Sequence, residues 1–434
     1  MYYQLSTIRL VPIRPLLQRL LLVALLPLAG CAPSCETHNS GPQHWKVGTP
    51  IVTYWAGPPM TDATAQQMSE GGWNLVWCTE KDLDVAQRHG LRAQLHDGLI
   101  SPDNLDDPAQ RNKLDALIDR VRSHPALYNY FLTDEPNTTN FAGLGKLVAY
   151  LRERDPAHLA YINLFPTYAN NEQLGTKGGT VPAYKEYLDQ YMAVVQPELI
   201  SYDHYQFAIK GDSADYFLNL AMVRRKAQET GRPFLNIVQA CTWASSMRVP
   251  TSDEMRYLVY TTLAYGAEGI SYYVYFAPGH TGMIAHADGT TTVLYDALKT
   301  LNREFVAVAS QLRPYKCLGV YHAGMLPPGT EPFPNNAPFR LDPPLPAMGY
   351  KPSQPVKGVM LAYFGPSQRD NKPARPTHVM VVNLDYKSEI DVDLAAPSKL
   401  QIFDATTATW SKPSGKKVKL HLPRGGGHLA RLNP

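Results

Sequence analysis

The sequence predicts an eight-stranded α/β barrel, a (β/α)8 TIM barrel, followed by a small C-terminal antiparallel β-sandwich. Eight short apolar runs alternate with eight helical patterns between residues 49 and 314. Such alternation indicates parallel strands joined by helices, and eight repeats are the number that closes a barrel. From about residue 315 the alternation stops, and a proline-dense stretch leads into short runs of alternating residues. These short runs are typical of an antiparallel sandwich.

The predicted barrel strands are apolar runs that each precede a helical pattern. They are 51–55, 73–78, 91–95, 128–133, 159–164, 199–205, 234–239 and 269–275. The predicted helices are 63–70, 81–89, 108–122, 141–154, 183–195, 214–230, 253–265 and 294–312. Residues at the helix starts support this assignment, because Thr61, Asn140 and Ser252 are good N-caps and Pro108 suits a first turn. Closure of the barrel requires the last strand, 269–275, to pair with the first, 51–55.

The C-terminal part is predicted to differ from the barrel in both composition and pattern. Prolines crowd residues 326–376, which indicates a long irregular excursion. The expected sandwich strands are 359–364, 378–385, 390–394, 400–404, 418–422 and 428–432. The predicted domains are therefore a barrel over 49–314, and an excursion with a sandwich over 315–434.

The N-terminus resembles an export signal rather than part of the fold. Arginines at 9, 14 and 19 precede the apolar run 20–28, and small residues lead to Cys31. This order of charge, apolar core and small residues is that of a secretory signal. The segment 28–31, Leu-Ala-Gly-Cys, resembles a bacterial lipobox, which implies a signal peptide over 1–30 and a lipid on Cys31. A tether over 31–48 follows, and Ala32 resembles the residue of lipoproteins sent to an outer membrane. The expected location is the bacterial cell envelope.

Composition narrows the choice of partners. Charged residues make up 18% of the chain, the net charge is +3, and no basic run is present, so nucleic-acid binding has little support. No CxxC pair or His-x-x-x-His spacing predicts a metal, and no cofactor is expected. Cys78 and Cys241 lie in apolar segments and are predicted to be buried small hydrophobic residues. The 26 tyrosines suit a carbohydrate-binding protein, since tyrosine offers a stacking face and a hydroxyl.

Two adjacent acids, Asp134 and Glu135, end the fourth predicted strand. Strand ends at this side of a β/α barrel carry its chemistry. Burial and the neighbouring Asp134 would raise the pKa of Glu135, which suits a general acid near neutral pH. Cleavage of a glycosidic bond requires such an acid to protonate the leaving oxygen. The plainer interpretation is a surface turn, because Asp-Glu-Pro also starts loops.

Other polar and aromatic residues also follow predicted strand ends. Asp203 is a candidate second catalytic group. The candidate substrate-binding residues are His96, Asp97, Asn163, His204, Tyr205, Gln239, Trp243, Tyr272 and Tyr275. We expect the acids, Tyr205 and Gln239 to converge in one pocket, with Trp243 and Tyr275 near its walls.

The strand order and Glu135 resemble the large clan A of retaining glycosidases. In that clan the acid/base follows an Asn on strand four, and a nucleophilic Glu ends strand seven. Here Asp134 replaces the Asn, and Gln239 stands where the nucleophile is expected. An amide cannot form the glycosyl ester, so the clan A mechanism does not transfer as a whole.

An adjacent Asp-Glu pair also resembles the barrel hexosaminidases, in which the 2-acetamido oxygen of the substrate is the nucleophile. The resemblance implies that Glu135 is the acid/base and that Asp134 orients the acetamido group, with Tyr205 or Gln239 binding its carbonyl. Alternatively, Asp203 or Asp97 is the base or nucleophile opposite Glu135. A separation of about 5–5.5 Å would then favour retention, and about 6.5–9.5 Å inversion.

The sequence thus predicts a lipid-anchored glycoside hydrolase that cleaves O-glycosidic bonds of a poly- or oligosaccharide. The alternative is a non-catalytic carbohydrate-binding lipoprotein on a degenerate barrel, which the missing strand-seven carboxylate favours. A structural or adhesive lipoprotein is a weaker option. The sugar, the linkage and endo or exo action stay open, because variable loops decide them.

Overall fold

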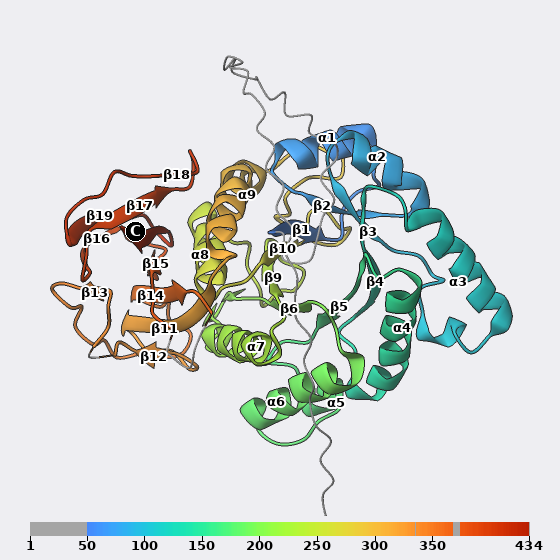
Figure 1. Cartoon of the computed structure of the whole chain (residues 1–434), viewed down its shortest axis with the longest axis horizontal. Helices are drawn as coiled ribbons and strands as arrows, with labels where there is room; N and C mark the ends of the chain where they lie inside the picture. The colour runs from blue at the N-terminus through green and yellow to red at the C-terminus, as the bar shows by residue number, and fades with distance from the viewer. Residues whose placement is uncertain (1–49, 335, 368–373, 434) are drawn as a thin grey trace, which may run out of the picture. The chain divides into compact units, whose positions relative to one another are not determined.

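Eight parallel strands form the centre of the first part of the chain (Figure 1). The computed structural model describes residues 50–334, 336–367 and 374–433. The strands are β1 (Ile51–Trp55), β2 (Leu75–Cys78), β3 (Arg92–Leu95), β4 (Leu127–Asp134), β5 (Leu159–Leu164), β6 (Ile200–His204), β9 (Phe234–Gln239) and β10 (Gly269–Tyr273). Their spatial order follows the chain, and β10 pairs in parallel with β1, with Gly269 opposite Ile51. The predicted pairing of first and last strands is confirmed.

The barrel is nearly closed at the seam between β1 and β2. Asn74, just before β2, makes two hydrogen bonds to Val52 across this seam. Its backbone N–H donates to the carbonyl of Val52 at 3.0 Å, and its side-chain oxygen accepts from the N–H of Val52 at 2.9 Å. A side-chain amide thus completes the ring where the strand ladder ends.

Helices follow the strands and surround them (Figure 1). They are α1 (Asp62–Glu70), α2 (Leu83–Arg88), α3 (Pro108–Val121), α4 (Phe141–Arg154), α5 (Asn171–Leu174), α6 (Thr180–Gln190), α7 (Tyr216–Thr230), α8 (Ser252–Ala264) and α9 (Val293–Leu312). Thr61 caps α1 as predicted, accepting from the N–H of Thr64 at 3.2 Å. The cap of α8 is Thr251 rather than Ser252, because Thr251 and Glu254 form a capping box. None of these helices, in the described part of the chain, is long and apolar enough to cross a membrane.

Alternate strand residues face opposite sides of the sheet, as the strand repeat of two residues requires. Ile51, Leu235 and Ile237 belong to an apolar cluster with Trp55 and other partly buried residues. Their neighbours in sequence form a second, larger cluster with residues of the surrounding helices. This alternation decides which side chains at a strand end can reach the barrel mouth.

The C-terminal part is a β-sandwich, as predicted. A seven-stranded sheet contains β11 (Lys316–Gly324), β12 (Glu331–Pro332), β14 (Gly358–Gly365), β15 (His378–Asn383), β17 (Leu400–Asp404), β18 (Thr409–Trp410) and β20 (Gly427–Leu432). A three-stranded sheet contains β13 (Arg340–Leu341), β16 (Ile390–Ala395) and β19 (Lys417–Leu422). An apolar cluster that includes Leu361, Val381 and Leu420 joins residues of the two sheets. β11 was not predicted, and the proline-dense stretch contains two short strands.

Several predictions fall outside the described residues. These are the signal peptide, the lipidation site Cys31 and the whole of the tether. The domain boundaries also stay predictions. The cysteines in the described part of the chain, Cys78, Cys241 and Cys317, are buried free thiols, so the prediction for the first two is confirmed.

Candidate active site

The acid dyad lies where β4 ends. Asp134 is the last residue of β4, and the pairing of β4 with β5 shifts register between Phe131 and Thr133. Glu135 follows with φ 44°, a left-handed conformation that side chains other than glycine seldom adopt. Its N–H donates to the carbonyl of Asn163 at 2.9 Å, which ties this conformation to β5. Backbone strain of this kind clusters at functional sites.

Asn163 connects the carboxylates of two strands. Its side-chain NH₂ donates to Asp134 at 3.0 Å and to Asp203 at 2.9 Å. Its side-chain oxygen accepts from the hydroxyl of Ser201 at 3.1 Å, so the amide is used on both sides. Asn163 and Asp203 are both buried. The ends of β4, β5 and β6 therefore hold Asp134, Asn163 and Asp203 in one polar network.

The carboxyls of Glu135 and Asp203 form a pair in which each affects the pKa of the other. Among the described residues, the Oδ2 atom of Asp203 has no N–H or hydroxyl donor, so the pair bonds only when one carboxyl carries a proton. Burial, aided by the charge of Asp134, raises the pKa of Glu135 to about 7. Burial and the charge of Glu135 raise the pKa of Asp203 well above its ordinary value. The pair can hold a transferable proton near neutral pH.

Aromatic rings from three barrel segments form one cluster, and burial together with the charges of the acids raises the pKa of two of them, Tyr205 and Tyr273. Tyr205 follows β6, Trp243 follows β9, and Tyr273 ends β10. Their ring centroids lie 4.6 Å apart for Tyr205 and Trp243, 5.0 Å for Tyr205 and Tyr273, and 4.9 Å for Trp243 and Tyr273. Trp243 is 37% exposed. We call these three residues the aromatic wall, and flat partly exposed rings of this kind suit the apolar face of a sugar.

A second set of rings comes from the first strands of the barrel. Trp77 and Trp55 meet Phe131 with ring centroids 4.7 and 5.6 Å apart. A polar cavity of about 500 Å³ also borders the dyad. Its lining includes Ser101, Asp103, Asp134, Glu135, Thr139 and Asn140. The acids thus have aromatic surface and hydroxyl, amide and carboxyl groups close by.

The predicted substrate-binding role is wrong for two tyrosines, Tyr272 and Tyr275. Tyr272 and Tyr275 are fully buried. The hydroxyl of Tyr272 donates to Asn302 on α9 at 2.8 Å, and that of Tyr275 donates to Gln67 on α1 at 2.7 Å. Both therefore pack between the sheet and the helices. Tyr273 takes the inward position, because successive strand residues point to opposite faces.

His204 also faces the helices rather than the acids. Its ring nitrogens lie 3.1 Å from the side chains of Asn219 on α7 and Ser213. Burial lowers the pKa of His204 to about 4, so the ring is neutral at neutral pH. This geometry contradicts the predicted substrate-binding role of His204.

Gln239 occupies the expected nucleophile position but serves the backbone. Its side-chain oxygen accepts from the N–H of Phe207 at 2.7 Å. Its NH₂ donates to the carbonyls of Phe207, Cys241 and Arg248 at 3.1, 3.3 and 2.7 Å. The amide is fully buried and has no group left for a substrate, so the geometry contradicts a binding role for Gln239.

The pair that follows β3 lies at a turn. The carboxylate of Asp97 accepts from the N–H of Leu99 at 2.8 Å, which stabilises the loop. His96 is exposed, and its ring lies 5.9 Å from that of Trp77. Substrate contact by His96 stays a prediction. Sequence reasoning did not single out Trp55, Trp77 or Phe131, although the inward alternation of their strands could have indicated them.

The raised pKa of Glu135 predicts a pH-dependent effect on stability. The pKa of this carboxyl is about 7 in the folded chain and near 4.5 when unfolded. Its proton-linked contribution to the free energy of unfolding is therefore fully present below about pH 4.5. That contribution is lost as the pH rises through about 7. We expect Glu135→Gln to change the Tm little at pH 4 and to raise it relative to the unmodified protein at pH 8. Thermal unfolding at both pH values, with Glu153→Gln on α4 as the control, measures this. A Tm difference that is the same at both would contradict it.

Comparisons with known proteins support the fold. No protein-family model matches the chain, and no curated protein matches it in sequence. Among solved structures, one described as a glycoside hydrolase is 10% identical with a TM-score of 0.50, covering 88% of this chain and 90% of its own. A glycoside hydrolase family 5 protein from Bacteroides vulgatus ATCC 8482 gives the same identity and TM-score, covering 88% and 87%. These neighbours confirm a barrel followed by a sandwich.

Proposed function

We propose that the chain is a glycoside hydrolase in which Glu135 is the general acid and base. The observation that carries this proposal is a half-buried carboxyl with a pKa of about 7, in contact with a second carboxyl at the C-terminal side of a barrel. An acid of this pKa can donate a proton at neutral pH and accept one back. The glycoside hydrolases that share the fold are consistent with this chemistry.

The position of Asp203 bears on the mechanism. Two carboxyls that flank a glycosidic bond lie about 5–5.5 Å apart in retaining enzymes and further apart in inverting ones. Glu135 and Asp203 are instead close enough for each to affect the pKa of the other, which suits a pair that shares a proton. We therefore assign Asp203 to positioning Glu135 and its proton. Asp97 is used by its own turn, and Gln239 cannot be a nucleophile.

These facts favour substrate assistance, with a 2-acetamido sugar as the substrate. Glu135 would protonate the leaving oxygen while the acetamido carbonyl oxygen attacks the anomeric carbon and forms an oxazolinium ring. Asp134 would accept a hydrogen bond from the acetamido N–H, and Tyr205 is the remaining candidate for its carbonyl. Water, deprotonated by Glu135, would then open the ring and release the sugar. The net reaction is hydrolysis of one O-glycosidic bond.

We further propose that the protein acts at the bacterial cell envelope, held by a lipid on Cys31. This part of the proposal rests on the sequence alone. The competing function is carbohydrate binding without catalysis. A hydrolysis screen separates the two: the chain from residue 36 is incubated with p-nitrophenyl glycosides of both anomers, with and without a 2-acetamido group. Release of p-nitrophenol from an acetamido sugar supports the enzyme. No release from any glycoside, together with binding on a glycan array, would favour the binding protein.

A further inference from the structure

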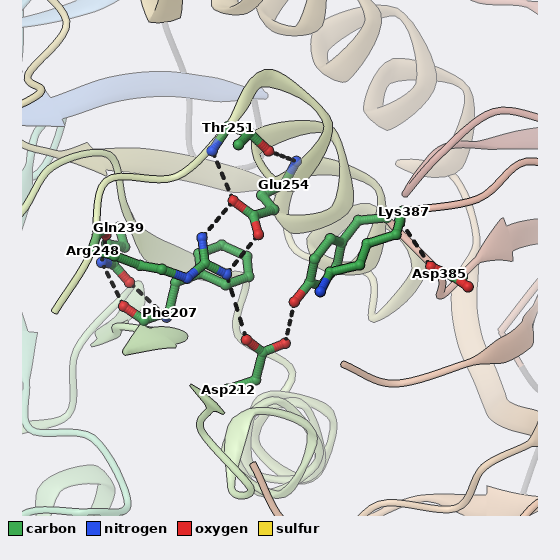
Figure 2. A network of polar contacts seen from close by, with 9 residues as sticks. Phe207, Asp212, Gln239, Arg248, Thr251, Glu254, Asp385 and Lys387 are labelled. Atoms are coloured by element: carbon green, nitrogen blue, oxygen red, sulfur yellow. Dashed lines mark hydrogen bonds and ion pairs between the residues drawn. The ribbon is translucent and has the colours of Figure 1, made fainter. Parts of the chain in front are cut away.

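A polar cluster joins the loop after β9 to the sandwich. We call it the Arg248 cluster, and its members are Asp212, Arg248, Glu254 and Tyr386 (Figure 2). The guanidinium of Arg248 donates to both carboxylate oxygens of Glu254, at 2.8 and 2.6 Å. It also lies 3.7 Å from Asp212, whose other oxygen accepts from the hydroxyl of Tyr386 at 2.7 Å. Tyr386 belongs to the sandwich, whereas the other three belong to the barrel.

The cluster allows little freedom in its geometry. Asp212, Glu254 and Tyr386 are all buried. Buried carboxylates are costly unless their charge is paired and their oxygens accept hydrogen bonds. A planar guanidinium meets one carboxylate through two parallel bonds, which fixes direction as well as distance. Arg248 also lies 4.8 Å above the ring of Phe207.

Both loops that carry the aromatic wall end on this cluster. Arg248 closes the loop after β9 that contains Trp243, and its backbone N–H donates to the carbonyl of Phe207 at 3.2 Å. Phe207 lies two residues after Tyr205. The Gln239 amide bridges the backbones of Phe207 and Arg248, at 2.7 Å to each (Figure 2). The cluster thus holds the two loops whose rings, Tyr205 and Trp243, meet at the wall.

We infer that Arg248 and Tyr386 are positioning residues for the aromatic wall, so that the sandwich contributes to sugar binding through the Tyr386 hydroxyl. The substrate part of this inference rests on the proposed function. The wall would stack on the sugar in the ground state and the transition state alike. Its disturbance then changes KM rather than kcat, because Glu135 and Asp134 are held separately by β5.

The test compares Tyr386→Phe and Arg248→Met with two matched controls in the full chain. Tyr260→Phe removes a hydroxyl that also donates to a carboxylate, Glu304, at 2.9 Å, and Arg256→Met removes a guanidinium from α8. With a p-nitrophenyl 2-acetamido glycoside, we expect KM to rise about 3- to 10-fold in Tyr386→Phe and more in Arg248→Met, with kcat within about twofold. The controls should leave both constants unchanged.

A second measurement does not depend on catalysis. Acrylamide quenching of the Trp243 fluorescence, taken as the difference from the same protein carrying Trp243→Phe, reports access to the wall. We expect quenching to increase in Arg248→Met and Tyr386→Phe but not in the controls. If no glycoside is hydrolysed, the proposed function fails, and the quenching alone decides whether the cluster positions the wall.

Two results would overturn the inference. One is unchanged KM and unchanged quenching in folded variants. The other is an equal rise of KM in Tyr386→Phe and Tyr260→Phe, which would indicate general loosening. If Arg248→Met does not fold, Arg248→Lys replaces it, since it keeps the charge but loses the two parallel bonds to Glu254.

Discussion

Glu135→Gln is expected to lower turnover by at least about 10²-fold while leaving sugar binding largely intact, because general acid catalysis typically contributes 10²–10⁴-fold. The amide keeps the shape of the side chain and removes the transferable proton. It also leaves Asp203 with a neutral partner, so the pair no longer shares a proton. The loss should be greatest for a substrate with a poor leaving group, since a good leaving group needs little protonation.

The measurement is kcat on a natural-type disaccharide and on its p-nitrophenyl analogue, with binding followed separately by calorimetry. Glu153→Gln on the outer face of the barrel is the control and should retain full turnover. Asp134→Asn should also impair turnover if Asp134 orients the acetamido group. Full activity of Glu135→Gln on the substrate with the poor leaving group would exclude this acid and favour the binding protein.

Removal of the 2-acetamido group from the substrate is expected to lower kcat/KM by at least about 10³-fold, because a nucleophile held within the substrate acts at a very high effective concentration. The 2-hydroxy counterpart keeps the sugar ring and the leaving group, but it has no carbonyl oxygen near the anomeric carbon. Rates on paired 2-acetamido and 2-hydroxy glycosides measure the difference.

Asp134→Asn provides the matching test within the protein. It should slow the acetamido substrate and leave the slow 2-hydroxy reaction little changed, because only the former uses Asp134. Similar rates on the two unmodified substrates would contradict substrate assistance. They would indicate that Asp203 or Asp97 moves to act as the catalytic partner.

The sequence predicted the barrel well because the spacing of apolar residues differs between its strands and its helices. The strands β1, β5 and β9 have the bounds that were predicted. β11 was missed although Pro314 precedes it and Pro327, Pro328 and Gly329 follow it. Gly319 lies inside this strand, and a glycine weakens a strand pattern. The barrel strands were therefore easier to predict than the number of strands in the sandwich.

The site was predicted only in part. The sequence identified the strand ends, but not the side of the sheet to which each side chain points. The choice of Tyr272 and Tyr275 over Tyr273 is an error of one residue in alternation, which places a ring on the opposite side of the sheet. The contact between Glu135 and Asp203 depends on the register of three strands and on the left-handed conformation of Glu135. No local pattern reports either of these. The role of Gln239 likewise depends on loops far along the chain.

Gln239 also constrains how this lineage can change. Its NH₂ donates to three backbone carbonyls, and a glutamate in its place would direct a carboxylate at those three oxygens. One carboxylate oxygen would keep the N–H of Phe207 as a donor, but the other would face only carbonyl oxygens, which is strongly disfavoured for a buried charge. A single substitution therefore cannot convert this barrel to a two-carboxylate enzyme, because the loops after β6 and β9 would have to be rebuilt first. Changes in these loops must therefore precede the change at Gln239. Directed evolution toward a strand-seven nucleophile would have to begin in those loops.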